Sequence, residues 1–215
     1  TVTDEQRVTK IKICGLTSMD DILTVNEYQP DYIGFVFAQK SRRFISVKQA
    51  ARCKQFLSEQ IASVGVFVNE PKERVAELLN QNIIQVAQLH GNETEQEIIW
   101  IKQQTGKPVI KAVSVHSKDD VPYWQQSSAD YLLFDNGAGG TGMAFDWNLL
   151  TESDKPYFLA GGIHSGNLAK ALTKGAYAID LSSGVETNGT KDPDKIAEVI
   201  RMVRGTSANK ANSLI

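Results

Sequence analysis

The chain has 215 residues, of which 41% are hydrophobic and 22% are charged, and these values are typical of a globular protein with a sizeable core. Its formal net charge is -2 and it contains no long basic run, so we expect no nucleic-acid partner. No apolar run approaches the length of a membrane span, and no signal peptide opens the sequence, so we expect no membrane partner either.

Cysteine and histidine residues are few and widely spaced. The two cysteines, Cys14 and Cys53, form neither a disulfide framework nor a metal-binding pattern, which favours a reducing, cytoplasmic location. The three histidines are His90, His116 and His164, and their separation fits no metal-ligand spacing. We therefore expect a protein without a bound metal.

Short runs of apolar or alternating residues predict about eight strands, with helical segments between them. The expected strands are residues 10–14, 31–37, 62–68, 85–90, 108–115, 131–135, 157–160 and 177–181. The expected helices begin near Ser18, Ser46 and Pro71, follow His90 in a Glu- and Gln-rich stretch, and continue at 119–126, 145–150, 165–173 and 193–203. We expect one domain over residues 1–205 and a small, polar, disordered tail over residues 206–215.

Strands that alternate with helices require a parallel sheet. Eight such units without a linker predict an α/β protein, a single (β/α)8 TIM barrel, with the active site at the C-terminal ends of the strands. An open, doubly wound sheet is the alternative, but that fold usually carries Gly-x-Gly-x-x-Gly after its first strand. Here the first strand ends in Cys14-Gly15-Leu16-Thr17.

The expected strand 131–135 consists of four large apolar residues and ends on Asp135. A carboxylate at the end of a buried strand needs a partner or a task. The alternative is that Asp135 caps a turn, which Asp-Asn-Gly sequences often do. Four glycines within residues 137–142 exceed what one turn requires, so we interpret Asp135 as a functional carboxylate beside a loop that approaches a ligand.

Cys14 is the candidate partner of Asp135. It shares the strand parity of Lys12, and if Ile11 and Ile13 pack outward against helices, Cys14 points into the barrel mouth. The alternative is a small core residue, which most free cysteines are and which Cys53 on its apolar helix face resembles. A thiol and a carboxyl group that face each other suggest proton transfer on a bound substrate.

The loops after the seventh and eighth strands are the commonest phosphate site in a (β/α)8 barrel. They contain Gly161-Gly162 and Ser182-Ser183-Gly184, whose backbone N–H groups and hydroxyls could bind a phosphate. Arg43 could grip a carboxylate or phosphate, although taken alone an exposed surface arginine is the commoner case. His90 is more often a hydrogen-bonded structural histidine than a base, and it ranks below Cys14 and Asp135.

Taken together, these motifs resemble those of the phosphoribosylanthranilate isomerase family. The matching stretches are Lys12-Ile13-Cys14-Gly15-Leu16-Thr17, Gly34-Phe35-Val36-Phe37, Lys40-Ser41-Arg42-Arg43, Gly65-Val66-Phe67, Gln88-Leu89-His90-Gly91, Phe134-Asp135, Gly139-Gly140-Thr141-Gly142, Phe145-Asp146-Trp147, Leu159-Ala160-Gly161-Gly162 and Asp180-Leu181-Ser182-Ser183-Gly184-Val185-Glu186. They occur in the right order from residue 10 to residue 186, so the resemblance covers nearly the whole chain.

The resemblance implies a cofactor-free Amadori rearrangement of N-(5-phosphoribosyl)anthranilate to 1-(2-carboxyphenylamino)-1-deoxyribulose 5-phosphate in tryptophan biosynthesis. It implies Cys14 as the general base, Asp135 as the general acid and Arg43 as the contact to the anthranilate. The phosphate would lie on Gly161, Gly162, Ser182, Ser183 and Gly184. The other expected substrate-binding residues are Gln88, His90, Gly140, Gly142 and Asp180.

Two residues depart from the family pattern, Arg42 where a proline is commoner and Met143 where a polar residue is commoner. Both lie outside the acid–base pair, so they put loop rigidity and affinity in question rather than the reaction. The expected ligand is a small phosphosugar. Other tryptophan-pathway domains are possible partners, because the sequence leaves open whether this chain was excised from a longer bifunctional polypeptide.

Two other functions stay open at the level of sequence. One is a catalytically silent phosphate-binding barrel, which would bind its ligand without turnover. The other is the histidine-pathway sugar-phosphate isomerase on the same fold, in which an aspartate would be expected at the position of Cys14.

Overall fold

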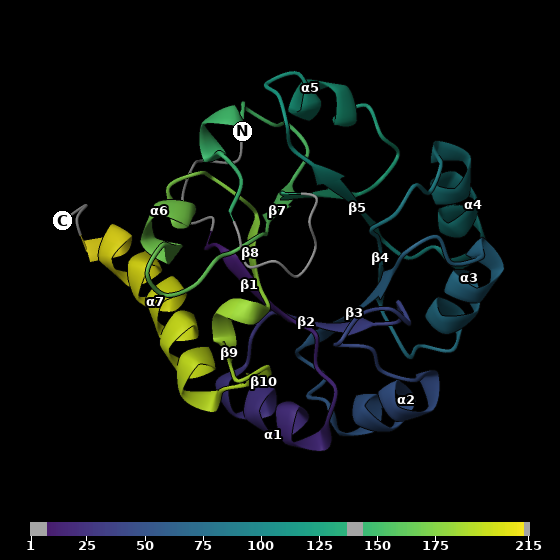
Figure 1. Ribbon diagram of the computed structural model, residues 1–215, viewed down its shortest axis with the longest axis horizontal. Helices are drawn as coiled ribbons and strands as arrows, with labels where there is room; N and C mark the ends of the chain where they lie inside the picture. Colours follow the sequence, from purple (N-terminus) through teal and green to yellow (C-terminus); the bar gives the residue numbers. More distant parts are fainter. Residues whose placement is uncertain (1–7, 137–143, 213–215) are drawn as a thin grey trace.

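The structure is a computed structural model that describes residues 8–136 and 144–212. Eight parallel strands pair in sequence order, and the last pairs with the first, so they close a barrel with helices on its outside (Figure 1). The strands are β1 Lys10–Cys14, β2 Tyr32–Val36, β3 Ala62–Phe67, β4 Val86–Leu89, β5 Val109–Ser114, β6 Tyr131–Asp135, β7 Tyr157–Leu159 and β8 Ala178–Leu181. The expected (β/α)8 TIM barrel is confirmed, and each of these strands lies within its expected range.

The outer elements vary in length more than the strands. The helices are α1 Met19–Tyr28, α2 Val47–Phe56, α3 Lys72–Asn80, α4 Glu95–Thr105, α5 Asp120–Trp124, α6 Leu168–Leu172 and α7 Pro193–Asn212. The remaining elements of the described residues are two 3-10 turns, η1 Trp147–Leu149 and η2 Ser183–Val185, and a hairpin of β9 Glu186–Thr187 and β10 Thr190–Lys191. Among the described residues, none of the helices has the length and apolar character that crossing a bilayer requires.

Helix starts follow from capping residues. Ser18 Oγ accepts a hydrogen bond from the backbone N–H of Asp21, and Ser46 Oγ accepts one from Gln49, so both expected caps are confirmed. Thr94 and Glu97 form a reciprocal capping box at the start of α4. These bonds satisfy N–H groups that have no partner within the helix itself.

The end of the chain differs from the expectation. The last helix was expected to stop near Val203, but α7 is Pro193–Asn212. The expectation of a disordered tail over residues 206–215 stays a prediction. Gly205 alone does not end the helix, because alanine and lysine residues that favour helix follow it and no proline does. Residues 213–215 lie outside the described part of the chain.

The core has two layers that follow from strand alternation. One face of each strand packs against the helices, and Ile11 and Ile13 lie there together with Ile22 of α1. The other face fills the barrel, where Val64, Ile110, Leu133 and Phe158 are among the buried residues. Cys14 and Lys12 are on this inner face, as the parity of β1 predicts.

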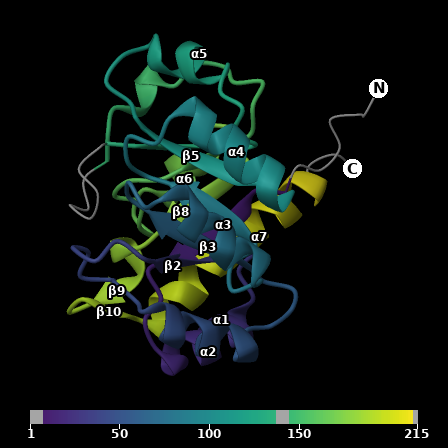
Figure 2. The same cartoon turned by 90° about the vertical axis from the view of Figure 1, so that its right-hand side faces the viewer.

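Figure 2 shows the β9–β10 hairpin at the left of the barrel, whereas α7 extends away from it toward the right. The hairpin follows β8 after the short turn η2, so it lies on the side where the strands end. The candidate residues at the strand ends therefore face the same opening as the hairpin.

Candidate active site

A cavity of about 960 Å³ opens at the C-terminal ends of the strands. It is lined by expected site residues from both halves of the chain, namely Cys14, Arg43, Gln88, His90, Asp135, Gly161, Gly162, Asp180, Ser182 and Ser183. Gly184 does not line it, but a side chain there would overlap the carbonyl of Ile163. Gly140, Gly142 and Met143 lie outside the described residues.

Cys14 ends β1 and points into the cavity with 9% of its surface exposed. Its neighbour on β2 is Gly34, where an added side-chain carbon would lie 2.5 Å from Cys14 Sγ. A residue without a side chain at position 34 therefore leaves room for the thiol. Burial raises the pKa of the Cys14 thiol, and the charges of Lys12 and Lys191 act in the opposite direction.

Asp135 ends β6 and is buried, with 5% of its surface exposed. Its Oδ2 lies 2.8 Å from Nε2 of His90, which follows β4. The fold therefore brings His90, which follows β4, into contact with Asp135 at the end of β6. Both Asp135 and His90 line the cavity.

A chain of polar groups continues from His90 across the interior of the barrel. His90 Nδ1 lies 2.9 Å from Gln88 Nε2, and Gln88 Oε1 accepts a 2.7 Å hydrogen bond from Lys12 Nζ. Lys12 is fully buried and also donates to Asp180 Oδ2 at 3.1 Å. Burial acts to lower the pKa of Lys12, but Asp180 and Cys14 outweigh it and raise that pKa, so the ammonium form persists.

Asp180 presents an unused acceptor. Its Oδ1 is buried and has no hydrogen-bond partner among the described residues, while the residue itself lines the cavity. A buried carboxylate oxygen is normally satisfied. Asp180 can therefore accept a hydrogen bond from a hydroxyl group of a ligand in the cavity.

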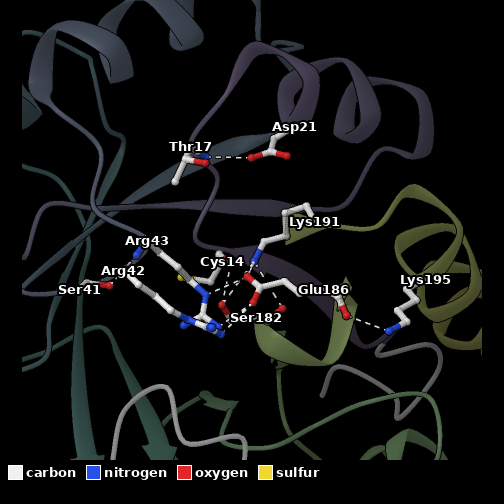
Figure 3. Close-up of polar contacts among 10 residues, drawn as sticks. All are labelled: Cys14, Thr17, Asp21, Ser41, Arg42, Arg43, Ser182, Glu186, Lys191 and Lys195. Carbon is white, nitrogen blue, oxygen red and sulfur yellow. Dashed lines mark hydrogen bonds and ion pairs between the residues drawn. The ribbon is translucent and has the colours of Figure 1, made fainter. Parts of the chain in front are cut away.

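Glu186 accepts hydrogen bonds from three cationic side chains on the Cys14 side of the cavity (Figure 3). Arg43 donates to it through Nε and Nη2, each at 2.8 Å, Lys191 Nζ lies 2.5 Å away, and Arg42 Nη2 lies 3.2 Å away. Burial acts to raise the pKa of Glu186, but hydrogen bonds from Arg43 and Lys191 lower it to about 2. Arg43 thus lines the cavity with its guanidinium already held by a carboxylate.

The sequence did not predict three residues that hold site side chains in place, namely Lys12, Glu186 and Lys191. A signal existed for Lys12, because it has the same parity as Cys14 and a charged residue on a buried strand face needs a partner. No comparable signal marks Glu186, whose contact to Arg43 joins residues 143 positions apart.

The two loops expected to bind phosphate lie on the same cavity. Gly161 and Gly162, at the end of β7, have φ values of 87° and 66°, which an L side chain rarely adopts. Ser182, after β8, donates through Oγ to the carbonyl of Cys14 at 3.0 Å. This bond couples the loop after β8 to the strand that carries the thiol.

Within the described ranges, no group of three or more His, Cys, Asp or Glu side chains is arranged to hold a metal ion. The polar groups that converge at the mouth are instead a thiol, carboxyl groups, amide and imidazole groups, and cations. A closed (β/α)8 barrel with these groups around one cavity belongs to the class of barrel enzymes whose active site is at the C-terminal ends of the strands.

Comparison with known proteins identifies a family within this class of barrel enzymes. The family model of N-(5'-phosphoribosyl)anthranilate (PRA) isomerase matches residues 11–202. An N-(5'-phosphoribosyl)anthranilate isomerase from Endomicrobium trichonymphae is 46% identical over 200 residues, covering 91% of this chain and 98% of that protein. The chain belongs to the N-(5'-phosphoribosyl)anthranilate isomerase family.

Solved structures agree in fold. Phosphoribosyl anthranilate isomerase from Thermus thermophilus superposes with a TM-score of 0.85 at 33% identity and covers 92% of this chain and 100% of its own. A second phosphoribosyl anthranilate isomerase, at 32% identity and a TM-score of 0.78, covers 92% and 99%. That protein was solved in complex with reduced 1-(o-carboxyphenylamino)-1-deoxyribulose 5-phosphate.

Proposed function

We propose that this protein converts N-(5-phosphoribosyl)anthranilate to 1-(2-carboxyphenylamino)-1-deoxyribulose 5-phosphate, the isomerisation step of tryptophan biosynthesis, by an Amadori rearrangement without a cofactor. The observation that carries the proposal is that Cys14 and Asp135, from β1 and β6, line one cavity. Membership of the isomerase family supports the substrate, as does the relative that was solved with a reduced carboxyphenylamino-deoxyribulose phosphate.

Asp135 acts as the general acid. It donates its proton to the ring oxygen of the ribose, the bond between that oxygen and C1 breaks, and the nitrogen lone pair forms an iminium ion. This role requires that Asp135 begins the reaction protonated, so that it has a proton to donate. His90 lies against the oxygen that would share the resulting charge.

Cys14 acts as the general base. The iminium ion acidifies the neighbouring C2–H bond, so a thiolate can take that proton and leave an enolamine. The enolamine becomes the ketone when C1 gains a proton and the C2 hydroxyl loses one. The reactive form is the thiolate, and the charges of Lys12 and Lys191 favour it. Burial opposes them, so only part of the enzyme carries the thiolate at neutral pH.

Binding groups surround the acid and the base. We assign the phosphate to the backbone of Gly161, Gly162, Ser183 and Gly184 together with Ser182, because such loops place N–H groups around an anion. Asp180 Oδ1 accepts from a ribose hydroxyl. Arg43 meets the anthranilate carboxylate, for which it must share its guanidinium with Glu186.

The decisive experiment is a turnover assay with the purified protein, which follows the loss of anthranilate-adduct fluorescence. We expect saturable turnover without added metal or cofactor. Binding of the substrate without turnover would indicate a silent phosphate-binding barrel and would overturn the proposal. Turnover of a histidine-pathway aminoaldose phosphate alone would point to the related isomerase instead.

A further inference from the structure

The polar chain through the barrel begins at a group that can only donate. Lys12 Nζ, fully buried, has Gln88 Oε1 at 2.7 Å and Asp180 Oδ2 at 3.1 Å. An ammonium group carries three N–H donors and no acceptor, so the atom of Gln88 that faces it must be the amide oxygen. The orientation of the Gln88 amide is therefore fixed by chemistry, independently of how its two terminal atoms are assigned.

The fixed amide determines the proton position on the next residue. With its oxygen on Lys12, Gln88 directs its NH2 group at His90 Nδ1, 2.9 Å away. Two donors cannot share one hydrogen bond, so Nδ1 must be the unprotonated, accepting nitrogen of a neutral imidazole. The proton of that imidazole is then on Nε2, which points at Asp135 Oδ2 at 2.8 Å.

We propose that Lys12 and Gln88 hold His90 in the Nε2–H tautomer, and that His90 is a positioning residue which donates to Asp135 Oδ2 and keeps the acidic proton of Asp135 on Oδ1. The part that concerns the acidic proton rests on the proposed function of Asp135; the tautomer does not. A protonated Oδ2 would face the Nε2–H of His90, and two hydrogens would then meet in one short contact.

This arrangement serves the acid in two ways. It directs the transferable proton to one oxygen, so the acid is presented in a single orientation. It also stabilises the carboxylate that remains once the proton has left, because His90 donates to that charge without having to reorganise. Gln88 and His90 were expected to bind substrate; here both ends of the Gln88 amide are already engaged within the protein.

The first test measures the tautomer directly. Nitrogen NMR of the histidine-labelled, unliganded protein at neutral pH should show, for His90, a protonated Nε2 and an unprotonated Nδ1. The signals are assigned by their loss in His90→Gln. Protonation at Nδ1, or at both nitrogens, overturns the proposal. This reading needs no substrate, so it stands or falls separately from the turnover assay.

The second test replaces the amide nitrogen of Gln88 by an oxygen, which should move the imidazole proton of His90 from Nε2 to Nδ1. In Gln88→Glu the carboxylate still accepts from Lys12, but its second oxygen faces His90 Nδ1 and requires a proton there. We expect NMR to show Nδ1 protonated and kcat to fall by on the order of 10²-fold, with a smaller change in KM. An unchanged His90 signal in this variant would contradict the inferred chain.

The matched control is Gln85→Glu, the same exchange just before β4. The Gln85 side chain accepts from the backbone N–H of Ser63 and takes no part in the Lys12–Gln88–His90 chain. It should leave both the His90 signals and kcat near those of the unmodified protein. Equal losses in the two variants would mean that the effect of Gln88→Glu is a general loss of stability, and would overturn the proposal.

The third test separates the hydrogen bond that His90 donates to Asp135 from the packing of the His90 side chain. His90→Gln retains an N–H donor that can reach Asp135, whereas His90→Leu keeps similar bulk without one. We expect His90→Gln to recover at least tenfold in kcat over His90→Leu. Equal kcat values in the two variants would show that the hydrogen bond to Asp135 does not position the acid.

Discussion

Strand parity decides which side chains reach the mouth of the barrel. Lys12 and Cys14 on β1 and Gln88 and His90 at the end of β4 are pairs two residues apart, so each pair lies on one face. That much can be predicted from the sequence. Their partners cannot, because the bond from Lys12 to Asp180 joins residues 168 positions apart and depends on closure of the barrel.

The assigned roles of Cys14 and Asp135 predict large losses from small changes. Cys14→Ser replaces a thiol by a far weaker acid, and Asp135→Asn removes the transferable proton while keeping the shape. Each should lower kcat by on the order of 10²–10⁴-fold with an unchanged circular dichroism spectrum. Cys53→Ser is the matched control, since Cys53 is buried on α2 and should affect stability but hardly kcat. Near-normal turnover in either site variant would remove that residue from the mechanism.

The environment of Cys14 predicts a pH dependence. Burial raises the pKa of its thiol, so the thiolate fraction at neutral pH is small and grows as the pH rises. We expect kcat/KM to increase with pH above neutrality, up to a limit set by the loss of other protonated groups. A profile of kcat/KM measured from about pH 6 to about pH 9 checks this. A rate that falls steadily over that range would contradict Cys14 as the base.

At the scale of elements, the inner strands are easier to predict than the outer segments. The strands are short, strongly apolar runs, and each was located from the sequence. The β9–β10 hairpin was missed, although Asn188-Gly189 at its turn, with φ values of 53° and 77°, is the dipeptide that a tight hairpin favours. Its strands of two residues each are too short to show alternation.

Glu186, in the β9–β10 hairpin, is expected to stabilise the fold through its charged hydrogen bonds. Glu186 accepts hydrogen bonds from Arg43 and Lys191, and its pKa falls from an ordinary value of 4.5 to about 2. A lowered acid pKa stabilises the fold fully above the ordinary value, and this stabilisation is lost as the pH falls through about 2. The shift corresponds to at most about 3 kcal/mol, and screening by solvent at the open side of the barrel reduces it.

Glu186→Gln should therefore lower the free energy of unfolding at about pH 7, and the difference from the unmodified protein should shrink toward about pH 3. Urea unfolding at both pH values measures it. Glu77→Gln is the control, because the ion pair of Glu77 with Arg74 on α3 is exposed and should contribute little. A difference that does not depend on pH would argue against the ion-pair account.

At the scale of the whole molecule, closure of the barrel brings distant strand ends into one cavity. β1 pairs with β8, and the bond from Ser182 Oγ to the carbonyl of Cys14 ties the two ends of the barrel together. The loops after β7 and β8, to which we assign the phosphate, are therefore linked to the strand that carries the Cys14 thiol. Energy from binding a phosphate there can position the sugar between Cys14 and Asp135.

This coupling predicts that the phosphate contributes to rate as well as to affinity. If two or three charge-assisted hydrogen bonds hold it, each contributes roughly 1.5–3 kcal/mol, so together they change kcat/KM by on the order of 10³-fold or more. A dephosphorylated substrate should show a lower kcat as well as a higher KM. Inorganic phosphate should compete with the substrate.

Gly162→Val should reproduce the loss, because a side chain at Gly162 would block the approach of the anion. Strain alone would also follow from its φ of 66°, so the control is Gly175→Val, where φ is 74° and no atom lies within 4 Å of an added carbon. Gly175 precedes β8, away from the strand ends, and Gly175→Val should lose stability but retain kcat/KM once folded. If the dephosphorylated compound reacts within about tenfold of the parent, or if the two glycine variants lose kcat/KM equally, the phosphate does not bind at these loops.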